Sequence, residues 1–296
     1  MNKPTPIRIP VNVVGAGSQP ADADGAAMEF MQMPSGMHTY SAPSVPETDD
    51  MAGLDAALET AQRIQAAVEA HEADQHAAVF SLDALDQNNR QFIDQLLGEG
   101  EVSVQCSGEI NALIQESVLA GIWRVQYTNA ENQVIKDTVE VAAIPDLVSK
   151  LTFSNAAKAI CLDQLDLPDS VYNAAPILTE LSDKLKSFQS GDEPHVINLS
   201  LLPHTEEDIE VLSANLGIGP NVILSRGYGN CRISSTATAN IWWVQYFNSQ
   251  DTLILNTLEM STVPEVACAS AEDLTDSADR LAEILSIYAT HPDDRD

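Results

Sequence analysis

The chain has few basic residues, few cysteines and no long apolar run. Among its 296 residues, 14 are Lys or Arg and 44 are Asp or Glu, which gives a formal net charge of -30. So acidic a chain disfavours nucleic acid and anionic membrane surfaces as partners, because binding to either requires attraction to negative charge. The acidic surface is compatible with two roles, attraction of a basic client or solubility alone.

The four cysteines are spread singly and form no Cys-x-x-Cys pair; they are Cys106, Cys161, Cys231 and Cys268. This spacing argues against a zinc ribbon and against a ferredoxin-type iron-sulfur pattern. Reduced thiols in the cytoplasm are the simplest explanation. The sequence also has no signal-peptide core and no run of about 18 apolar residues that would span a membrane. We therefore expect a cytoplasmic protein.

Catalytic and cofactor motifs are missing as well. Neither a Gly-x-Ser-x-Gly elbow nor a Walker loop occurs, and Gly98 and Gly100 lack the third glycine of a dinucleotide fingerprint. His71 and His76 are five positions apart, not the four that would place both on one helical face as in a zinc protease. We expect a protein that is not an enzyme and that has no cofactor and no resident metal.

The strongest pattern is an internal repeat. A shift of 119 residues aligns 76–147 with 195–266 without a gap. Identical pairs include glycine, proline and tryptophan positions, among them Gly98/Gly217, Gly108/Gly227, Trp123/Trp242, Tyr127/Tyr246, Glu140/Glu259 and Pro145/Pro264. Self-similarity of this kind indicates a tandem duplication. The two segments should adopt one chain path.

Each copy predicts the same order of elements. A helix over 54–70 or 174–189 precedes a short strand, and a second helix begins at Asp86 or Thr205, whose side chains suit an N-cap. That helix should end at Gly98 or Gly217, where glycine permits a positive φ. Strands follow over 102–141 and 221–260, and a last helix covers 271–288. We expect an α+β fold, a duplicated α/β unit with antiparallel hairpins packed on helices. Its parts would be a disordered arm (1–50), a first repeat (51–160) and a second repeat with a C-terminal helix (161–296).

The last hairpin of each copy has a shared apolar face, since alternate residues of a strand point to opposite sides. We assign to the core Trp123, Val125 and Tyr127 with Ile135, Val139 and Val141, and likewise Trp242, Val244 and Tyr246 with Ile254, Leu258 and Met260. The opposite face of the first copy, which includes Arg124 and Glu140, is polar and expected in solvent. In the second copy that opposite face is apolar.

The apolar opposite face must be covered by something. It is covered either by the chain itself, through the final helix or the first copy, or by a partner. Our candidate partner-binding residues are Trp243, Phe247, Leu253 and Leu255, together with Arg226, Tyr228 and Arg232 of the nearby basic cluster. We expect Phe247 and Tyr228 to be more exposed than Trp243.

Cys231 is the candidate reactive thiol. Arg226 and Arg232 flank it in sequence, and nearby guanidinium charge favours a thiolate. The alternative is a turn leading into a strand, with Cys231 as a small buried residue. Its counterpart in the first copy is Ala112, so the repeat itself does not require a thiol. His76 and His195 begin equivalent strands, and we expect structural roles for them instead of metal binding.

Several long stretches resemble one family, the hydrogenase expression proteins HupH and HyaF, also called HoxQ. They are 33–37 (MPSGM), 97–102 (LGEGEV), 119–124 (LAGIWR), 224–233 (LSRGYGNCRI), 240–248 (NIWWVQYFN) and 263–268 (VPEVAC). Together they extend over nearly the whole chain.

This resemblance implies a role in maturation of an uptake nickel-iron hydrogenase. The implied client is the iron-sulfur small subunit, held before assembly and export, and the implied companion is a thioredoxin-like accessory protein of the HyaE or HupG type. The leading hypothesis is a non-enzymatic chaperone that shields apolar surface and attracts a basic export signal. The alternative is a cysteine-based factor, in which Cys231 and Cys268 transfer an iron-sulfur cluster or exchange thiols. The resemblance supplies no catalytic residues.

Overall fold

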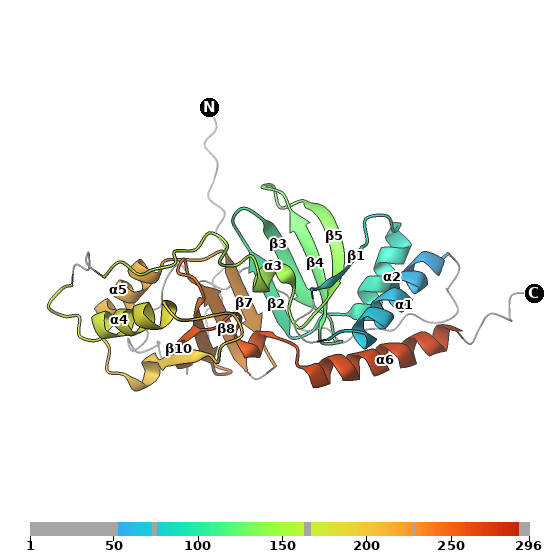
Figure 1. The fold of residues 1–296 in the computed structure, drawn as a ribbon. Coiled ribbons are helices and arrows are strands. Elements are labelled where there is room, and N and C mark those ends of the chain that lie inside the picture. Colours follow the sequence, from blue (N-terminus) through green and yellow to red (C-terminus); the bar gives the residue numbers. More distant parts are fainter. Residues whose placement is uncertain (1–52, 73–75, 163–166, 228, 290–296) are drawn as a thin grey trace, which may run out of the picture.

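The structure, a computed structural model, describes residues 53–72, 76–162, 167–227 and 229–289 (Figure 1). The first repeat contains α1 (Asp55–Glu69), β1 (Ala78–Ser81), α2 (Gln87–Leu97), β2 (Val102–Cys106), β3 (Asn111–Glu116), β4 (Ile122–Thr128), β5 (Val134–Val141) and α3 (Asp146–Ser149). The second contains α4 (Ala174–Leu185), β6 (His195–Asn198), η4 (Leu199–Leu201), α5 (Glu206–Leu216), β7 (Asn221–Ser225), β8 (Asn230–Ser235), β9 (Ile241–Phe247), β10 (Leu253–Met260) and η5 (Glu265–Ala267), and α6 (Ala271–Ala289) follows. The expected duplication of a mixed helix and strand unit is confirmed. The arm predicted over 1–50 lies outside the described residues.

The helix ends follow from local sequence. The Asp86 side chain accepts a hydrogen bond from the backbone N–H of Asn89 at the start of α2. Thr205 does the same for Asp208 at the start of α5, where the two residues form a reciprocal capping box. Both helices stop at a glycine with positive φ, 57° at Gly98 and 68° at Gly217. These caps are where the sequence places them.

The ten strands of the described residues form one antiparallel sheet in the order β1-β5-β4-β3-β2-β7-β8-β9-β10-β6. The strand order of the second repeat therefore mirrors that of the first. The join is the pairing of β2 with β7 over all five residues of each strand, so the two repeats share a single sheet. The boundaries that we drew at residues 50 and 160 separate sequence units that pack as one body.

The strand register corrects our assignment of faces in the last hairpins. Trp123 lies opposite Glu140, whereas Val139 lies opposite Arg124 on the other side of the sheet. Trp242 likewise faces Glu259, and Trp243 faces Leu258. The pairing is one residue away from the pattern we expected, because the alternation within each strand does not fix the register between two strands. Ile135 and Ile254, which we placed in the core, are exposed.

The sheet is buried on both faces, by three clusters of apolar side chains. On one face, α1, α2 and α6 cover the first repeat, and α4 and α5 cover the second. On the other face, a central cluster unites the two repeats and includes Trp123, Trp242, Val104 and Ile223 beneath α3 and η5. No helix of the described residues combines the length and apolarity that crossing a bilayer requires.

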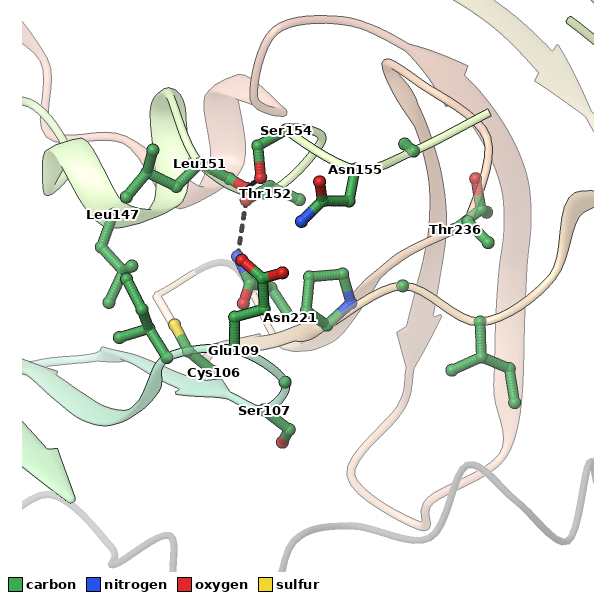
Figure 2. A pocket seen from close by; sticks show the side chains of 17 residues that line it. Cys106, Ser107, Glu109, Leu147, Leu151, Thr152, Ser154, Asn155, Asn221 and Thr236 are labelled. Carbon is green, nitrogen blue, oxygen red and sulfur yellow. Dashed lines mark hydrogen bonds between the residues drawn. The ribbon is translucent and has the colours of Figure 1, made fainter. Parts of the chain in front are cut away.

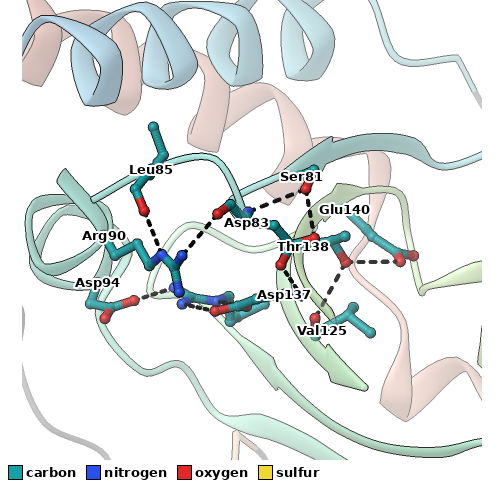
Figure 3. Close-up of polar contacts among 10 residues, drawn as sticks. Ser81, Asp83, Leu85, Arg90, Asp94, Val125, Asp137, Thr138 and Glu140 are labelled. Carbon is teal, nitrogen blue, oxygen red and sulfur yellow. Dashed lines mark hydrogen bonds and ion pairs between the residues drawn. The ribbon is translucent and has the colours of Figure 1, made fainter. Parts of the chain in front are cut away.

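We expected the polar face of the first repeat to lie in solvent, but at Arg124 this face is buried. Its guanidinium forms ion pairs with Asp137 on β5 and with Asp94 on α2, and its side chain is 16% exposed. Figure 3 shows the two carboxylates, Asp94 and Asp137. Thr138 and Glu140 are buried on the opposite face. An arginine is tolerated here because two carboxylates compensate its charge.

The C-terminal helix α6 packs on the first repeat, not on the second as we expected. Leu274, Ala278, Leu281 and Leu285 join the cluster formed by α1 and α2 (Figure 1). The Phe92 and Tyr288 rings meet edge to face at 5.5 Å. In the reciprocal direction, Ile160 of the linker that leaves the first repeat joins the core of the second. Each repeat is thus completed by the segment that follows the other.

Candidate functional site

One hollow of the described residues lies at the junction of the repeats, and we call it the junction cleft. Its volume is about 570 Å³. It lies where β2 ends and β7 begins, between the β2–β3 loop, the segment after α3, and the loops before β7 and after β8. Its lining residues are Cys106, Ser107, Gly108, Glu109, Ile110, Leu147, Leu151, Thr152, Ser154, Asn155, Ala156, Ile218, Gly219, Pro220, Asn221, Thr236 and Ala237.

A buried hydrogen bond fixes one wall of the junction cleft. Figure 2 shows Asn221 and Thr152 facing one another, and Asn221 Nδ2 donates to Thr152 Oγ1 at 2.5 Å. The backbone N–H of Asn221 also donates to Ser235 Oγ at 2.9 Å. A Cβ on Gly219 would lie 2.4 Å from that same oxygen, so the close approach of the loop requires glycine. These contacts define the wall.

The rim of the junction cleft is apolar, and its surface is nearly uncharged. Ile110, Leu151 and Ile218 are 42%, 45% and 67% exposed. Glu109 is the charged side chain among the lining residues. A hollow with apolar rim positions and polar backbone and hydroxyl groups is suited to a polypeptide segment.

The cysteines do not supply the junction cleft with a nucleophile. Cys106 lines it but is 4% exposed, and burial raises the pKa of its thiol to about 12. A thiol in this state stays protonated and weakly reactive near neutral pH.

Trp243, the first of our candidate partner-binding residues, is not at the surface. It is 2% exposed and packs in the core beneath α4 and α5, and its indole Nε1 donates to Asn256 Oδ1 at 2.6 Å. The chain itself covers this face, although the cover comes from α4 and α5 and not from α6 or the first copy. The prediction of a docking face at Trp243 is therefore wrong.

The other apolar candidates do not share one face. Phe247 pairs with Leu253, but a register shift follows, and Leu255 pairs with Tyr246 on the opposite side of the sheet. All three are partly buried. Phe247 is more exposed than Trp243, as we predicted. Their role in partner binding stays a prediction.

The arginines of the basic cluster, Arg226 and Arg232, lie at different places in the structure. Arg226 is partly buried at the end of β7 away from the junction cleft, where its backbone N–H donates to Glu101 O at 3.1 Å. Tyr228 lies outside the described residues. Arg232 lies on β8, opposite Gln245 and on the same face as Trp243. A partner-binding role for these residues also stays a prediction.

The structure contradicts a reactive thiol at Cys231. The residue is 3% exposed and belongs to the central cluster, and burial raises the pKa of its thiol to about 12. Burial likewise raises the pKa of Cys268 to about 12. Within the described ranges, no three His, Cys, Asp or Glu side chains gather as a metal site would require.

Each of the two equivalent histidines lies close in space to an acidic side chain. His76 Nδ1 lies 2.9 Å from Asp146 Oδ2, and His195 Nε2 lies 2.8 Å from Glu180 Oε1. His195 belongs to β6 at one edge of the sheet, whereas His76 precedes β1 at the other edge. They do not form a common ligand pair.

Comparison with known proteins identifies the class. The family model described as the HupH hydrogenase expression protein, C-terminal conserved region, matches the chain twice, over residues 54–159 and 171–288. The two matches correspond to the two repeats of the sheet. The chain belongs to the HupH hydrogenase expression/formation protein family.

Individual relatives cover nearly the whole chain. It is 45% identical over 277 residues to the hydrogenase expression/formation protein HoxQ of Cupriavidus necator, covering 94% of this chain and 96% of that protein. It is 44% identical over 274 residues to HupH of Rhodobacter capsulatus, covering 92% and 94%. A solved structure, hydrogenase expression protein HupH from Thiobacillus denitrificans, is 31% identical, with a TM-score of 0.35, and covers 40% of this chain and 96% of its own.

Proposed function

We propose that this protein is a non-enzymatic, cytoplasmic assembly chaperone that holds the iron-sulfur small subunit of an uptake nickel-iron hydrogenase before assembly and export. The observation that carries the proposal is the similarity over nearly the full length to proteins named for hydrogenase expression and formation. A role in hydrogenase maturation follows from that family membership. The chaperone mechanism and the small-subunit client are the proposed part.

The junction cleft supports a holding function. It offers exposed apolar side chains at Ile110, Leu151 and Ile218 around a lining whose charged side chain is Glu109. Its occupant in this proposal is an extended segment of the small subunit, held by rim contacts and by hydrogen bonds to the lining groups. The excess of 44 acidic over 14 basic residues favours approach of a basic export signal.

The alternative, a thiol or cluster-transfer factor, receives less support. It assigned the chemistry to Cys231 and Cys268, and burial raises the pKa of both thiols to about 12. A thioredoxin-like companion remains a proposed partner and would act on exposed surfaces instead.

The test is co-purification with the hydrogenase small subunit from cells that express the hydrogenase. Ile218→Asp places a charge on the rim at an exposed position, so it should leave the fold intact and lower recovery of the small subunit at least about tenfold, since an apolar contact becomes a desolvated charge. Ile254→Asp is the matched control, because Ile254 is 60% exposed at the opposite end of the strands. Equal recovery by both variants would reject the cleft as the client site, and no recovery by the unmodified chain would reject the client.

A further inference from the structure

Arg232 lies in a second, smaller hollow on the helix-covered face of the sheet, which we call the Arg232 pocket. Its volume is about 60 Å³. Arg232 projects from β8 on the face that carries Leu224 and Gln245. The pocket is lined by Ser213, Gly217, Ile218, Gly219, Val222, Arg232, Ser234, Ser235, Thr236 and Trp243.

The guanidinium of Arg232 has no compensating charge within the part of the chain that the structure describes. It takes part in none of the ion pairs formed there. Burial lowers the pKa of Arg232, and no acidic side chain of the described residues raises it again. By contrast, burial acts on Arg124 in the same direction, but Asp137 and Asp94 outweigh it and raise the pKa of that residue. An uncompensated, partly buried cation is unexpected in a chain with 44 acidic residues.

The fold itself does not require a cation at this position. The residue equivalent to Arg232 in the first repeat, 119 positions earlier, is Leu113, which occupies the same place on β3. The residue equivalent to Asp94, the carboxylate on α2 that holds Arg124, is Ser213 on α5. The second repeat therefore has a cation that the first lacks and a hydroxyl where the first has a carboxylate. A small hollow is left between them.

We propose that the Arg232 pocket binds a carboxylate group of a bound polypeptide, with the Arg232 guanidinium as the cationic anchor and the Ser213 hydroxyl as a further donor. The planar guanidinium offers two parallel N–H donors that match the two oxygens of a carboxylate. The size of the pocket suits such a small planar group. A singly charged ligand is also favoured over a phosphate dianion, because the chain's net charge of -30 repels two negative charges more strongly than one.

The Arg232 pocket adjoins the junction cleft, since Ile218, Gly219 and Thr236 line both. A polypeptide that occupies the cleft can therefore place an acidic side chain or its own terminal carboxylate at Arg232. The inference does not depend on the proposed function, because the pocket recognises the carboxylate whichever protein carries it.

Trp243 provides the reporter for an experiment on the full-length chain. It lines the pocket and its indole N–H is fixed by Asn256, so a ligand at Arg232 should shift its nuclear magnetic resonance signal. The chain has three tryptophans, and labelling them with nitrogen-15 gives three indole signals to be assigned with single Trp→Phe variants. The probes are sodium acetate, acetyl-Ala-Glu-Ala-amide, and acetyl-Ala-Ala-Leu with a free terminal carboxylate. Sodium phosphate and the uncharged Gln and Leu-amide peptides serve as references, all at one ionic strength set with chloride.

We expect a saturable shift of the Trp243 signal with acetate and with at least one acidic peptide, and none with the uncharged peptides. The peptide that binds more tightly identifies the source of the carboxylate, side chain or terminus. No saturable shift, tighter binding of phosphate, or binding of acetate without either acidic peptide would overturn the proposal.

Two variants test the assignment to Arg232. Arg232→Leu, which introduces the residue that the first repeat has, should remain folded and weaken carboxylate binding at least about tenfold, because the charge-assisted hydrogen bonds are lost. Ser213→Asp should also abolish binding, since it supplies the carboxylate from within the chain as Asp94 does for Arg124. Carboxylate binding that is unchanged in Arg232→Leu would overturn the proposal.

Discussion

Val104 pairs directly with Ile223, its own counterpart 119 residues later in the second repeat. Two equivalent residues can face one another in an antiparallel pair only if an approximate twofold axis passes between them. The duplicated units therefore meet as the two subunits of a symmetric dimer do, but within one chain. Both side chains are buried in the central cluster that unites the repeats.

The first prediction concerns this axis. Ile223→Ala should lower the free energy of unfolding by about 2–5 kcal/mol, because it creates a cavity at the join. A single urea transition should persist, since the sheet is continuous across the repeats. Ile254→Ala, at an exposed position, is the control and should change stability by less than about 0.5 kcal/mol. Two separated transitions in the unmodified chain would show that the repeats unfold independently.

The second prediction transfers an ion pair of the first repeat to the equivalent positions of the second repeat. Trp243→Arg should destabilise the protein by about 3–5 kcal/mol, because it places an unpaired charge in the core. Adding Asn256→Asp should recover part of that loss, since Arg124 and Asp137 form this cross-strand ion pair in the first repeat. Urea unfolding of the single and double variants measures the recovery. A double variant no more stable than Trp243→Arg would contradict the equivalence of the two sites.

The third prediction concerns the buried carboxyl of Glu116, which is 6% exposed and accepts a hydrogen bond from the backbone N–H of Gly121 at 3.2 Å. Burial raises its pKa from 4.5 to about 7. Its stabilising contribution is thus complete below pH 4.5 and is lost as the pH rises to about 7. Glu116→Gln keeps an acceptor for Gly121 and should be more stable than the unmodified chain at pH 8, on the order of 3 kcal/mol at most.

That advantage of Glu116→Gln should shrink as the pH is lowered toward 5. Chemical unfolding at several pH values checks both the size and the direction. An advantage that is independent of pH would mean that Glu116 does not titrate in this range.

The fourth prediction concerns Asp208, which joins the starts of α4 and α5. Its Oδ1 accepts hydrogen bonds from the backbone N–H groups of Tyr172, Asn173 and Ala174 at 3.0, 2.8 and 2.8 Å. Burial alone would raise its pKa, but these bonds and that of Thr205 outweigh burial and lower it from 3.8. Its stabilising contribution is therefore present above that pH and lost below it.

Asp208→Asn should cost about 1–3 kcal/mol at neutral pH, because the amide N–H₂ meets backbone donors. The loss should become smaller near pH 3, where the unmodified carboxyl begins to be protonated. Asn89 is the equivalent residue in the first repeat and accepts from Ala57 N–H at 2.9 Å, so Asn89→Asp is the reciprocal control. A loss that grows at low pH would contradict a charged Asp208 in the folded state.

The sequence predicted what local chemistry determines. The caps at Asp86 and Thr205 and the stops at Gly98 and Gly217 depend on residues a few positions away, and the repeat depends only on self-comparison. The assignment of Val139 beside Trp123 failed, because cross-strand register is set by turn geometry and not by the alternation within one strand. Trp243 was misplaced for a related reason, since no local signal shows that α4 and α5 cover it.

The junction cleft could not be predicted from the sequence, for a different reason. It exists because β2 pairs with β7, which brings Ile110 and Ile218 to one rim from different repeats. The loops that form it contain ordinary turn residues with no chemical signature. Likewise, nothing in the composition of α6 reveals that it crosses to the first repeat.

If the junction cleft holds the hydrogenase small subunit, as we propose, site-specific photocrosslinking in hydrogenase-expressing cells should capture the small subunit at the cleft. A photoreactive amino acid would replace Ile218 or Leu151 on the rim, or Ile254 at the opposite end of the strands as the control. We predict crosslinks to the small subunit from positions 218 and 151 and none from 254. Crosslinks from 254 alone, equal crosslinks from all three positions, or crosslinks from 218 and 151 to a different protein would show that the small subunit is not held in the junction cleft.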